Sequence, residues 1–211
     1  MFGLNDSSIT AVTSIIVAII TFIITPFVTK YAEKLFPKTE IKKDDITTTL
    51  DVAGLISDKM QSIKDELGVD RVLLSQFHNG GNFIHSGQGI KKFSIFYETL
   101  KFGIDSIKLH YQNIPISLFH KYIENIRQVR WVRVNFVEHN TEMYDIEPIG
   151  EYHEIKTRYA FAIFTLDDKF AGFLELDFIH NVVELSEKQI TKLQQEVGAI
   201  GGILINTVNK K

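Results

Sequence analysis

The sequence contains no cysteine. The chain therefore cannot form a disulfide bond, cannot use a thiolate as a nucleophile or metal ligand, and cannot attach a linear tetrapyrrole through a thioether bond. Histidine occurs seven times, but no HExxH pair or other strong metal-binding spacing is present. We expect these histidines to be exposed or structural, and we expect no metal site.

The chain also has no large excess of positive or negative side chains. The 23 basic and 26 acidic residues give a formal net charge of -3, so no strong positive field favours a nucleic-acid partner. Phosphate-binding GxxxxGK[ST] and GxGxxG loops are missing, and no Ser-His-Asp order or paired-carboxylate signature follows from the spacing. We therefore predict that the protein is not an enzyme.

One long uncharged segment is present near the N-terminus. Residues 8–29 hold no charged side chain, and a helix of that length, at about 1.5 Å per residue, just crosses a bilayer core of about 30 Å. Five lysines follow within fourteen positions, whereas Asp6 is the one charge before the segment. The positive-inside bias then places the following residues in the cytoplasm.

We accordingly predict a single-pass membrane protein whose N-terminus lies outside and whose C-terminal domain is cytoplasmic. Its parts would be a transmembrane helix at residues 8–29, a basic juxtamembrane linker at 30–45 and a folded domain at 46–208. The lipid bilayer is its first expected partner, since the lysines beside the span favour anionic headgroups.

Two helices are expected at the ends of the folded domain. Residues 46–67 carry apolar side chains at steps of three and four, and Gly68 ends that pattern. A second helix begins after Ser186, which forms a capping box with Gln189. Apolar residues recur at heptad-like spacing along one seam of each helix, which predicts a homodimer that forms through these seams. The alternative is that both seams are buried within one monomer. The seam of the second helix consists of Ile190, Leu193, Val197, Ile200 and Leu204.

Three glycines lie within five residues of the second helix. Each glycine weakens a helix by about 1 kcal/mol relative to alanine, so a cluster of them needs a compensating gain. We expect that another helix or the sheet approaches closely at this point. The three residues are Gly198, Gly201 and Gly202.

Five segments between the helices have a period of two and many β-branched or aromatic residues, which predicts strands. The last two are joined by residues 167–169, a connection short enough for an antiparallel hairpin. Pro115 suits the first turn of a helix that continues through Tyr122 and Ile126. The predicted strands span residues 71–78, 93–100, 130–137, 159–166 and 170–178.

Alternation along the last strand assigns its side chains to two faces. Phe170, Gly172, Leu174 and Leu176 would pack on the terminal helices. Phe173, Glu175 and Asp177 would point to the opposite face, where the two carboxylates could serve a ligand. Salt bridges to Arg130 and Arg133 are the commoner explanation for such a pair.

The element order, the hairpin at residues 159–178 and the helix start at 185–189 resemble the GAF domain, a relative of PAS. The resemblance covers residues 44–208 and implies an α+β fold in which the terminal helices pack on one face of an antiparallel sheet. The run Gln76-Phe77-His78-Asn79-Gly80-Gly81, with Lys92-Phe93-Ser94 and Tyr97-Glu98, is similar to small uncharacterised GAF-like proteins, many of them encoded by bacteriophages.

The resemblance also implies a function. GAF domains bind cyclic nucleotides, tetrapyrroles or other small effectors on the sheet face opposite the terminal helices, and the equivalent cover here is residues 79–92 and 103–122. We expect a membrane-anchored sensory or ligand-binding module of viral source, without a catalytic output of its own. The alternative is a ligand-free structural or assembly protein of a phage or its host membrane. No particular cofactor is indicated.

The loop at residues 79–92 is the candidate edge of the pocket. Its four glycines leave backbone N–H groups exposed, and two lysines close the loop, so it could wrap a small anionic ligand. The alternative is a turn-rich connection in which His78 and Asn79 hold the glycine turn. The candidate ligand-binding residues are Phe77, His78, Asn79, Gly80, Gly81, Phe83, Lys91, Lys92, Phe93, Tyr97 and Glu175.

Overall fold

The computed structural model describes Phe22 and residues 45–82, 87, 89–138, 144 and 146–208. The chain divides into two compact units, Met1–Lys43 and Asp44–Lys211. The predicted transmembrane helix at 8–29 lies outside the described residues except for Phe22, and the predicted linker at 30–45 does so except for Asp45. Within the described part, no helix combines the length and the apolar character needed to cross a bilayer.

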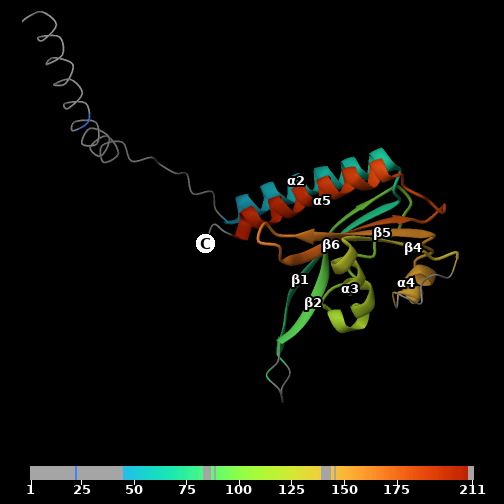
Figure 1. Ribbon diagram of the computed structural model, residues 1–211, viewed down its shortest axis with the longest axis horizontal. Coiled ribbons are helices and arrows are strands. Elements are labelled where there is room, and N and C mark those ends of the chain that lie inside the picture. Colours follow the sequence, from blue (N-terminus) through green and yellow to red (C-terminus); the bar gives the residue numbers. More distant parts are fainter. Residues whose placement is uncertain are drawn as a thin grey trace, which may run out of the picture. The chain divides into compact units, whose positions relative to one another are not determined.

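Two long helices, α2 (Asp45–Leu67) and α5 (Glu187–Val208), lie side by side on one face of the sheet (Figure 1). Gly68 ends α2 with a positive φ of 66°, which glycine adopts without steric cost. The predicted capping box of α5 is confirmed: the Ser186 backbone N–H donates to Gln189 Oε1 at 2.9 Å, and the Gln189 N–H donates to Ser186 Oγ at 3.4 Å.

The sheet is fully antiparallel, with the strand order β3-β2-β1-β6-β5-β4. The five predicted strands and the closing hairpin are confirmed. The sixth strand, β3, was missed because two residues are too few to show a period. The strands are β1 (Arg71–Asn82), β2 (Gly89–Leu100), β3 (Ile114–Pro115), β4 (Trp131–Asn135), β5 (Thr157–Phe164) and β6 (Phe170–Phe178).

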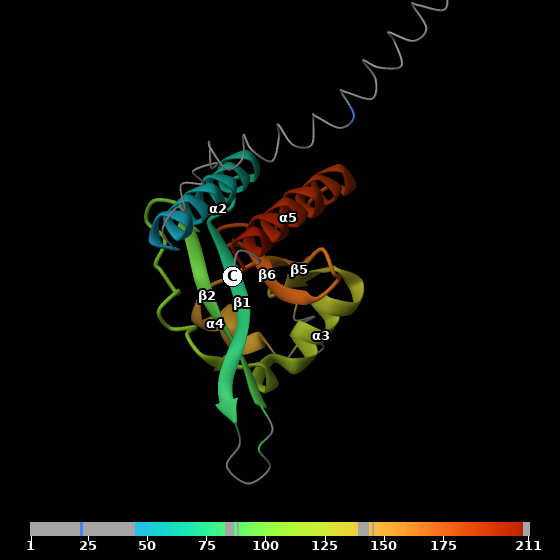
Figure 2. The same cartoon turned by 90° about the vertical axis from the view of Figure 1, so that its left-hand side faces the viewer.

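Shorter helices cover the other face of the sheet, as the two views together show (Figure 2). They are the 3-10 helix η1 (Ile116–Phe119), α3 (His120–Val129) and α4 (Glu147–Tyr152). The expectation that Pro115 starts a helix is corrected: Pro115 ends β3, and a 3-10 turn precedes α3. The sheet is thus the middle layer between two helical layers of different character.

The core between the sheet and the long helices is apolar. It includes Ile56, Met60, Leu174, Leu176, Leu193, Val197 and Ile200. Three residues of the predicted dimer seam are therefore buried within the monomer and are not free to contact a second chain. The homodimer remains a prediction, but it cannot use Leu193, Val197 and Ile200 as proposed.

One of the three α5 glycines meets the sheet. A Cβ at Gly201 would lie 2.8 Å from the Phe164 carbonyl oxygen, whereas nothing lies within 4 Å of a Cβ at Gly198 or Gly202. Close packing is confirmed for Gly201 alone. A tighter approach occurs inside the sheet, where a Cβ at Gly172 would lie 2.1 Å from the Ser75 carbonyl oxygen.

Phe170 lies on the face opposite to the one predicted. The pairing register shifts between Ile163↔Gly172 and Phe164↔Phe170, so β6 holds one extra residue, Ala171. Such a bulge reverses the alternation of side chains. Phe170 consequently packs in the cluster under the short helices, while the predicted assignment of Leu174 and Leu176 to the helix face is confirmed.

Candidate functional site

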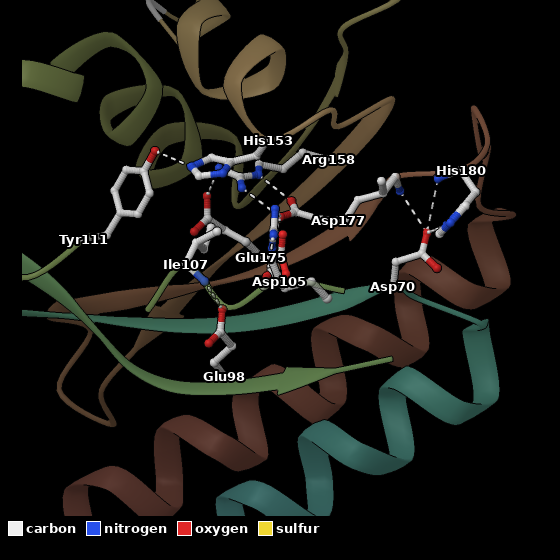
Figure 3. A network of polar contacts seen from close by, with 12 residues as sticks. Asp70, Glu98, Asp105, Ile107, Tyr111, His153, Arg158, Glu175, Asp177 and His180 are labelled. Carbon is white, nitrogen blue, oxygen red and sulfur yellow. Dashed lines mark hydrogen bonds and ion pairs between the residues drawn. The ribbon is translucent and has the colours of Figure 1, made fainter. Parts of the chain in front are cut away.

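A buried ion cluster crosses three strands on the face covered by the short helices (Figure 3). Arg71 of β1, Asp177 of β6 and Arg158 of β5 are direct cross-strand neighbours, and none is more than 3% exposed. Asp177 Oδ2 accepts hydrogen bonds of 2.9 Å from Arg71 Nε and from Arg158 Nη2, and its Oδ1 accepts one of 2.6 Å from Arg158 Nε. The strand register therefore assembles the cluster.

Glu175 extends the cluster towards α3. Its Oε1 accepts a 2.9 Å hydrogen bond from Arg158 Nη1 and a 2.8 Å hydrogen bond from the Tyr122 hydroxyl. On the other side, Arg71 Nη1 donates to the Asp105 carbonyl at 3.2 Å. Two guanidiniums thus face two carboxylates, which offsets the desolvation cost that each charge would carry alone.

The protonation behaviour of the two carboxyls differs. Burial raises the pKa of Glu175, and the neighbouring Arg158 does not fully reverse that effect. Burial also acts on Asp177, but the guanidiniums of Arg158 and Arg71 outweigh it and hold the pKa below its usual value. Burial and the nearby Glu175 raise the pKa of Tyr122 well above its usual value, so its hydroxyl stays protonated and donates.

A small cavity of about 20 Å³, lined mainly by buried residues, lies beside the cluster. It has room for about one water molecule. Arg158, Glu175 and Tyr122 supply its polar groups. The cover of the cavity comes from α4 and from the expected segment 103–122, and none of the described residues of 79–92 lines it. The apolar lining consists of Leu73, Phe93, Ile95, Ile107, Phe119, Ile149 and Phe173, together with the ring of Tyr111.

An open groove of about 620 Å³ lies next to this cavity, lined by Tyr111, Ile149, Glu151 and Tyr152. Two residues, Tyr111 and Ile149, line both spaces. The Tyr111 hydroxyl forms a 3.0 Å hydrogen bond with His153 Nε2. Burial, followed by the positive charges of Arg71 and Arg158, lowers the pKa of His153 to about 4. The imidazole is therefore neutral at pH 7.

Most residues of the predicted pocket edge lie outside the cavity. β1 pairs with β6 at residues 71–76 but continues with β2 to Asn82, so the two strands form an arm beyond the sheet. On this arm His78 Nε2 contacts Ser94 Oγ at 2.9 Å, Lys91 Nζ donates to Asn79 Oδ1 at 2.6 Å, and the Lys92 side chain lies against Gly80. Gly81, with a φ of 91°, follows on the same arm.

The remaining candidates are divided between two faces. Phe93 and Glu175 line the cavity, and Phe77 packs nearby, with its ring centroid 5.9 Å from that of Phe173. Tyr97 instead packs under the long helices. A register shift between Leu74↔Tyr97 and Ser75↔Ile95 inserts one extra residue, Phe96, and reverses the face. Phe83 lies outside the described residues.

Glu175 and Asp177 lie on one face as predicted, but their arginine partners are Arg71 and Arg158 instead of Arg130 and Arg133. Arg130 lies 3.7 Å over the Phe164 ring and contacts Asp168, and it does not reach Glu175 or Asp177. The actual partners, Arg71 and Arg158, each directly precede a run of apolar or aromatic residues at the start of a strand. That placement was the signal that could have identified them. In the described part of the chain, no three His, Asp or Glu residues gather as a metal site would require.

No model of a known protein family matches the sequence, and no curated protein matches it either. Solved structures do match. A far-red cyanobacteriochrome photoreceptor is 13% identical, with a TM-score of 0.58 over 90% of this chain and 99% of that chain. The phycocyanobilin-bound GAF domain of a cyanobacterial phytochrome is 16% identical, with a TM-score of 0.59 over 77% and 88%.

A third match is the GAF domain region of a Geobacter sulfurreducens PCA protein assigned as a membrane protein. It is 16% identical, with a TM-score of 0.56 over 78% of this chain and 99% of that chain. At these identities the matches report on the fold. Together with the curved antiparallel sheet and its terminal helices on one face, they give this domain a GAF-like fold.

Proposed function

We propose that residues 46–208 form a sensory module that binds a small effector on the sheet face opposite α2 and α5, without a catalytic output of its own. The observation that carries this proposal is the cavity, in which aromatic and aliphatic walls meet the polar groups of Arg158, Glu175 and Tyr122. Apolar walls with a few fixed polar groups are typical of small-molecule sites. The cavity also lies on the face that the GAF resemblance indicates.

The effector differs from the bilin of the phytochrome neighbour. This chain has no cysteine for a thioether bond, and a space of about 20 Å³ is too small for a tetrapyrrole. A small effector requires only a local opening of the cover. We therefore propose a ligand with few heavy atoms.

A ligand-free structural role is the second candidate, and a specific observation favours it. The two arginines and two carboxylates of the cluster are paired with one another at 2.6–2.9 Å. A cluster that neutralises itself needs no ligand charge to hold the sheet face together.

Native mass spectrometry of the full-length chain, purified in mild detergent from the cells that produced it, separates these candidates. Retained extra mass from a non-covalent small molecule is the expected result. Loss of that mass in Glu175→Gln, with the melting temperature measured in parallel, would assign it to the cavity. Loss in Lys91→Ala/Lys92→Ala would assign it to the arm instead. A measured mass equal to that of the protein alone in every preparation would favour the structural role.

We further propose that residues 8–29 anchor this module in a membrane with the domain in the cytoplasm. The uncharged run and the lysines after it support this topology, and the Geobacter neighbour is itself assigned as a membrane protein. A C-terminal alkaline phosphatase fusion should stay inactive, and detergent should be needed for extraction. Recovery in the soluble fraction would contradict the anchor.

A bacteriophage source is proposed on the resemblance around residues 76–81 alone. Neighbouring genes for capsid, tail or lysis proteins would support it. A chromosomal neighbourhood without phage genes would contradict it.

A further inference from the structure

Tyr111 lies between the small buried cavity and the open groove. Its ring lines both spaces, as Ile149 does from α4. The ring also packs on Leu73, Ile95 and Ile107, a small apolar cluster at the floor of the cavity. Tyr111 and Ile149 therefore lie at the boundary between the groove and the cavity that holds Arg158 and Glu175.

Among the described residues, one hydrogen bond holds the Tyr111 hydroxyl at this position. Its partner is His153 Nε2 at 3.0 Å, directly after the end of α4 (Figure 3). The two rings also contact each other, with centroids 5.6 Å apart. The bond joins two neutral groups at neutral pH, so it is among the weaker polar contacts of this face. The ion pairs behind it are charge-assisted and hold the floor in place.

We propose that the Tyr111 phenol is a built-in placeholder for the effector: bonded to His153 it closes the cavity, and a single-ring molecule carrying a hydroxyl group displaces it. The proposal rests on the proposed effector-binding function and deepens it. When the phenol swings out, the space that it leaves joins the cavity and has the size and shape of one aromatic ring. Phe93 and Phe119 offer aromatic walls there, and His153 offers the hydrogen bond that Tyr111 gave up.

The absence of native cysteine permits a direct measurement of opening. An Ile95→Cys substitution places one thiol on the cavity floor, at a position that is 3% exposed. Leu174→Cys places a control thiol on the opposite face at a position that is fully buried. The rate at which a small water-soluble thiol reagent labels each full-length protein reports opening of the cavity in one case and global unfolding in the other.

Tyr111→Phe removes the hydroxyl and keeps the ring. We expect labelling of the Ile95→Cys thiol to accelerate roughly two- to ten-fold, which corresponds to the loss of one neutral hydrogen bond, while labelling of the Leu174→Cys thiol stays unchanged. Tyr97→Phe is the matched control, because Tyr97 packs on the helix face. If the labelling rate stays unchanged at both thiols, or rises equally at both, the hydroxyl of Tyr111 does not close the cavity and the proposal is wrong.

Tyr111→Ala in the Ile95→Cys background tests the ligand class, with p-cresol as a free copy of the tyrosine side chain. We expect p-cresol to slow labelling at a concentration roughly two- to ten-fold below that needed for toluene, which has the ring but no hydroxyl. Equal protection by both compounds, or none by either, would overturn the placeholder. Neither labelling test needs the natural effector, so their failure is distinct from an empty mass spectrum.

Discussion

On one face of the sheet, β6 contributes Leu174 and Leu176 to an apolar core under α2 and α5, whereas on the other face it contributes Glu175 and Asp177 to a buried ion cluster. The apolar face gains stability from area removed from water, which is not directional and tolerates exchanges of similar volume. The charged face tolerates no single loss, because each group is the partner of another. Two modes of burial thus share one strand.

The two faces therefore contribute differently: the apolar face stabilises the fold, and the charged face fixes the positions of its side chains. Apolar side chains could fill the charged face at equal or lower cost, since well-packed hydrophobic replacements of buried ion pairs are often neutral or stabilising. What the ion cluster adds is fixed geometry: Arg158 is held by three hydrogen bonds to two carboxylates, at the wall of the cavity. The face under the short helices is therefore the one suited to recognise a ligand.

The largest effect is expected from Asp177→Ala, which leaves Arg71 and Arg158 buried without their shared carboxylate. The free energy of unfolding should fall by about 3–5 kcal/mol, measured by urea unfolding of the full-length protein with the fluorescence of Trp131, the single tryptophan. Asp167→Ala, at an exposed turn, should change it by less than about 0.5 kcal/mol.

The same urea unfolding experiment can test whether the two faces differ in this way. Replacing Arg71 with Met, Arg158 with Met, Asp177 with Leu and Glu175 with Gln together leaves no buried charge without a partner and should recover most of the lost stability. If this quadruple variant is as unstable as Asp177→Ala, the two faces do not differ in the way described, and the ion cluster is required for folding itself.

Tyr122→Phe should have the next largest effect. It removes the hydroxyl that donates to Glu175 at 2.8 Å inside the charged face, and the expected loss is about 1.5–3 kcal/mol, as for hydrogen bonds to charged groups. Tyr152→Phe is the control, because Tyr152 is 76% exposed and should change stability little. Equal losses in the two variants would show that the buried hydroxyl carries no special weight.

The apolar face offers a matched pair on one helix. Gly201→Ala brings a Cβ within 2.8 Å of the Phe164 carbonyl oxygen, so overpacking outweighs the gain in helix propensity and the net loss is roughly 1 kcal/mol. Gly198→Ala meets nothing within 4 Å and should stabilise by up to about 1 kcal/mol. Thermal unfolding of both variants checks the signs, and a shared sign would contradict the packing.

The last effect, at the rim of the charged face, is absent at neutral pH and develops only on acidification. The pKa of His153 is lowered to about 4, by burial and then by Arg71 and Arg158, against the pull of Asp177. Between pH 6.5 and pH 4 the unfolded chain therefore binds a proton that the folded chain does not, and stability falls as the pH falls. His153→Gln should flatten this decline and leave stability above pH 6.5 without a pH-dependent difference. Parallel curves would contradict the assignment.

Much of the architecture was predictable because it follows from periodicity. The stripe of α2, the capping box at Ser186 and the hairpin of β5 and β6 are local patterns, and each is found in the structure. The exact faces of Tyr97 and Phe170 were not predictable, since one inserted residue in β2 and one in β6 reverse the alternation. The insertion in β2 has no glycine or proline beside it to mark it, whereas Gly172 directly follows the inserted Ala171 of β6.

The candidate site was harder to predict than the fold, because its partners meet through the register of distant strands. Glu175 and Asp177 could be placed on one face by alternation alone. Their pairing with Arg158 and Arg71 required knowing that β6 lies between β5 and β1. The contact between Tyr111 and His153 depends on two irregular connections, for which no period exists. The glycine and lysine content of the arm predicted a ligand-binding edge, but the described residues of this arm do not line the cavity.

The position of β6 beside β1 also sets an order of events during synthesis. Arg71 and Asp177 are 106 residues apart in the sequence, so at bacterial or eukaryotic elongation rates roughly 5–20 s pass between the emergence of the first residue and that of the second. Throughout this interval β1 has one edge without its neighbour, and its arginine stays hydrated. The central pairing of the sheet therefore becomes available only when β6, the last strand in the sequence, has emerged, and until then the edge of β1 has no partner from that strand.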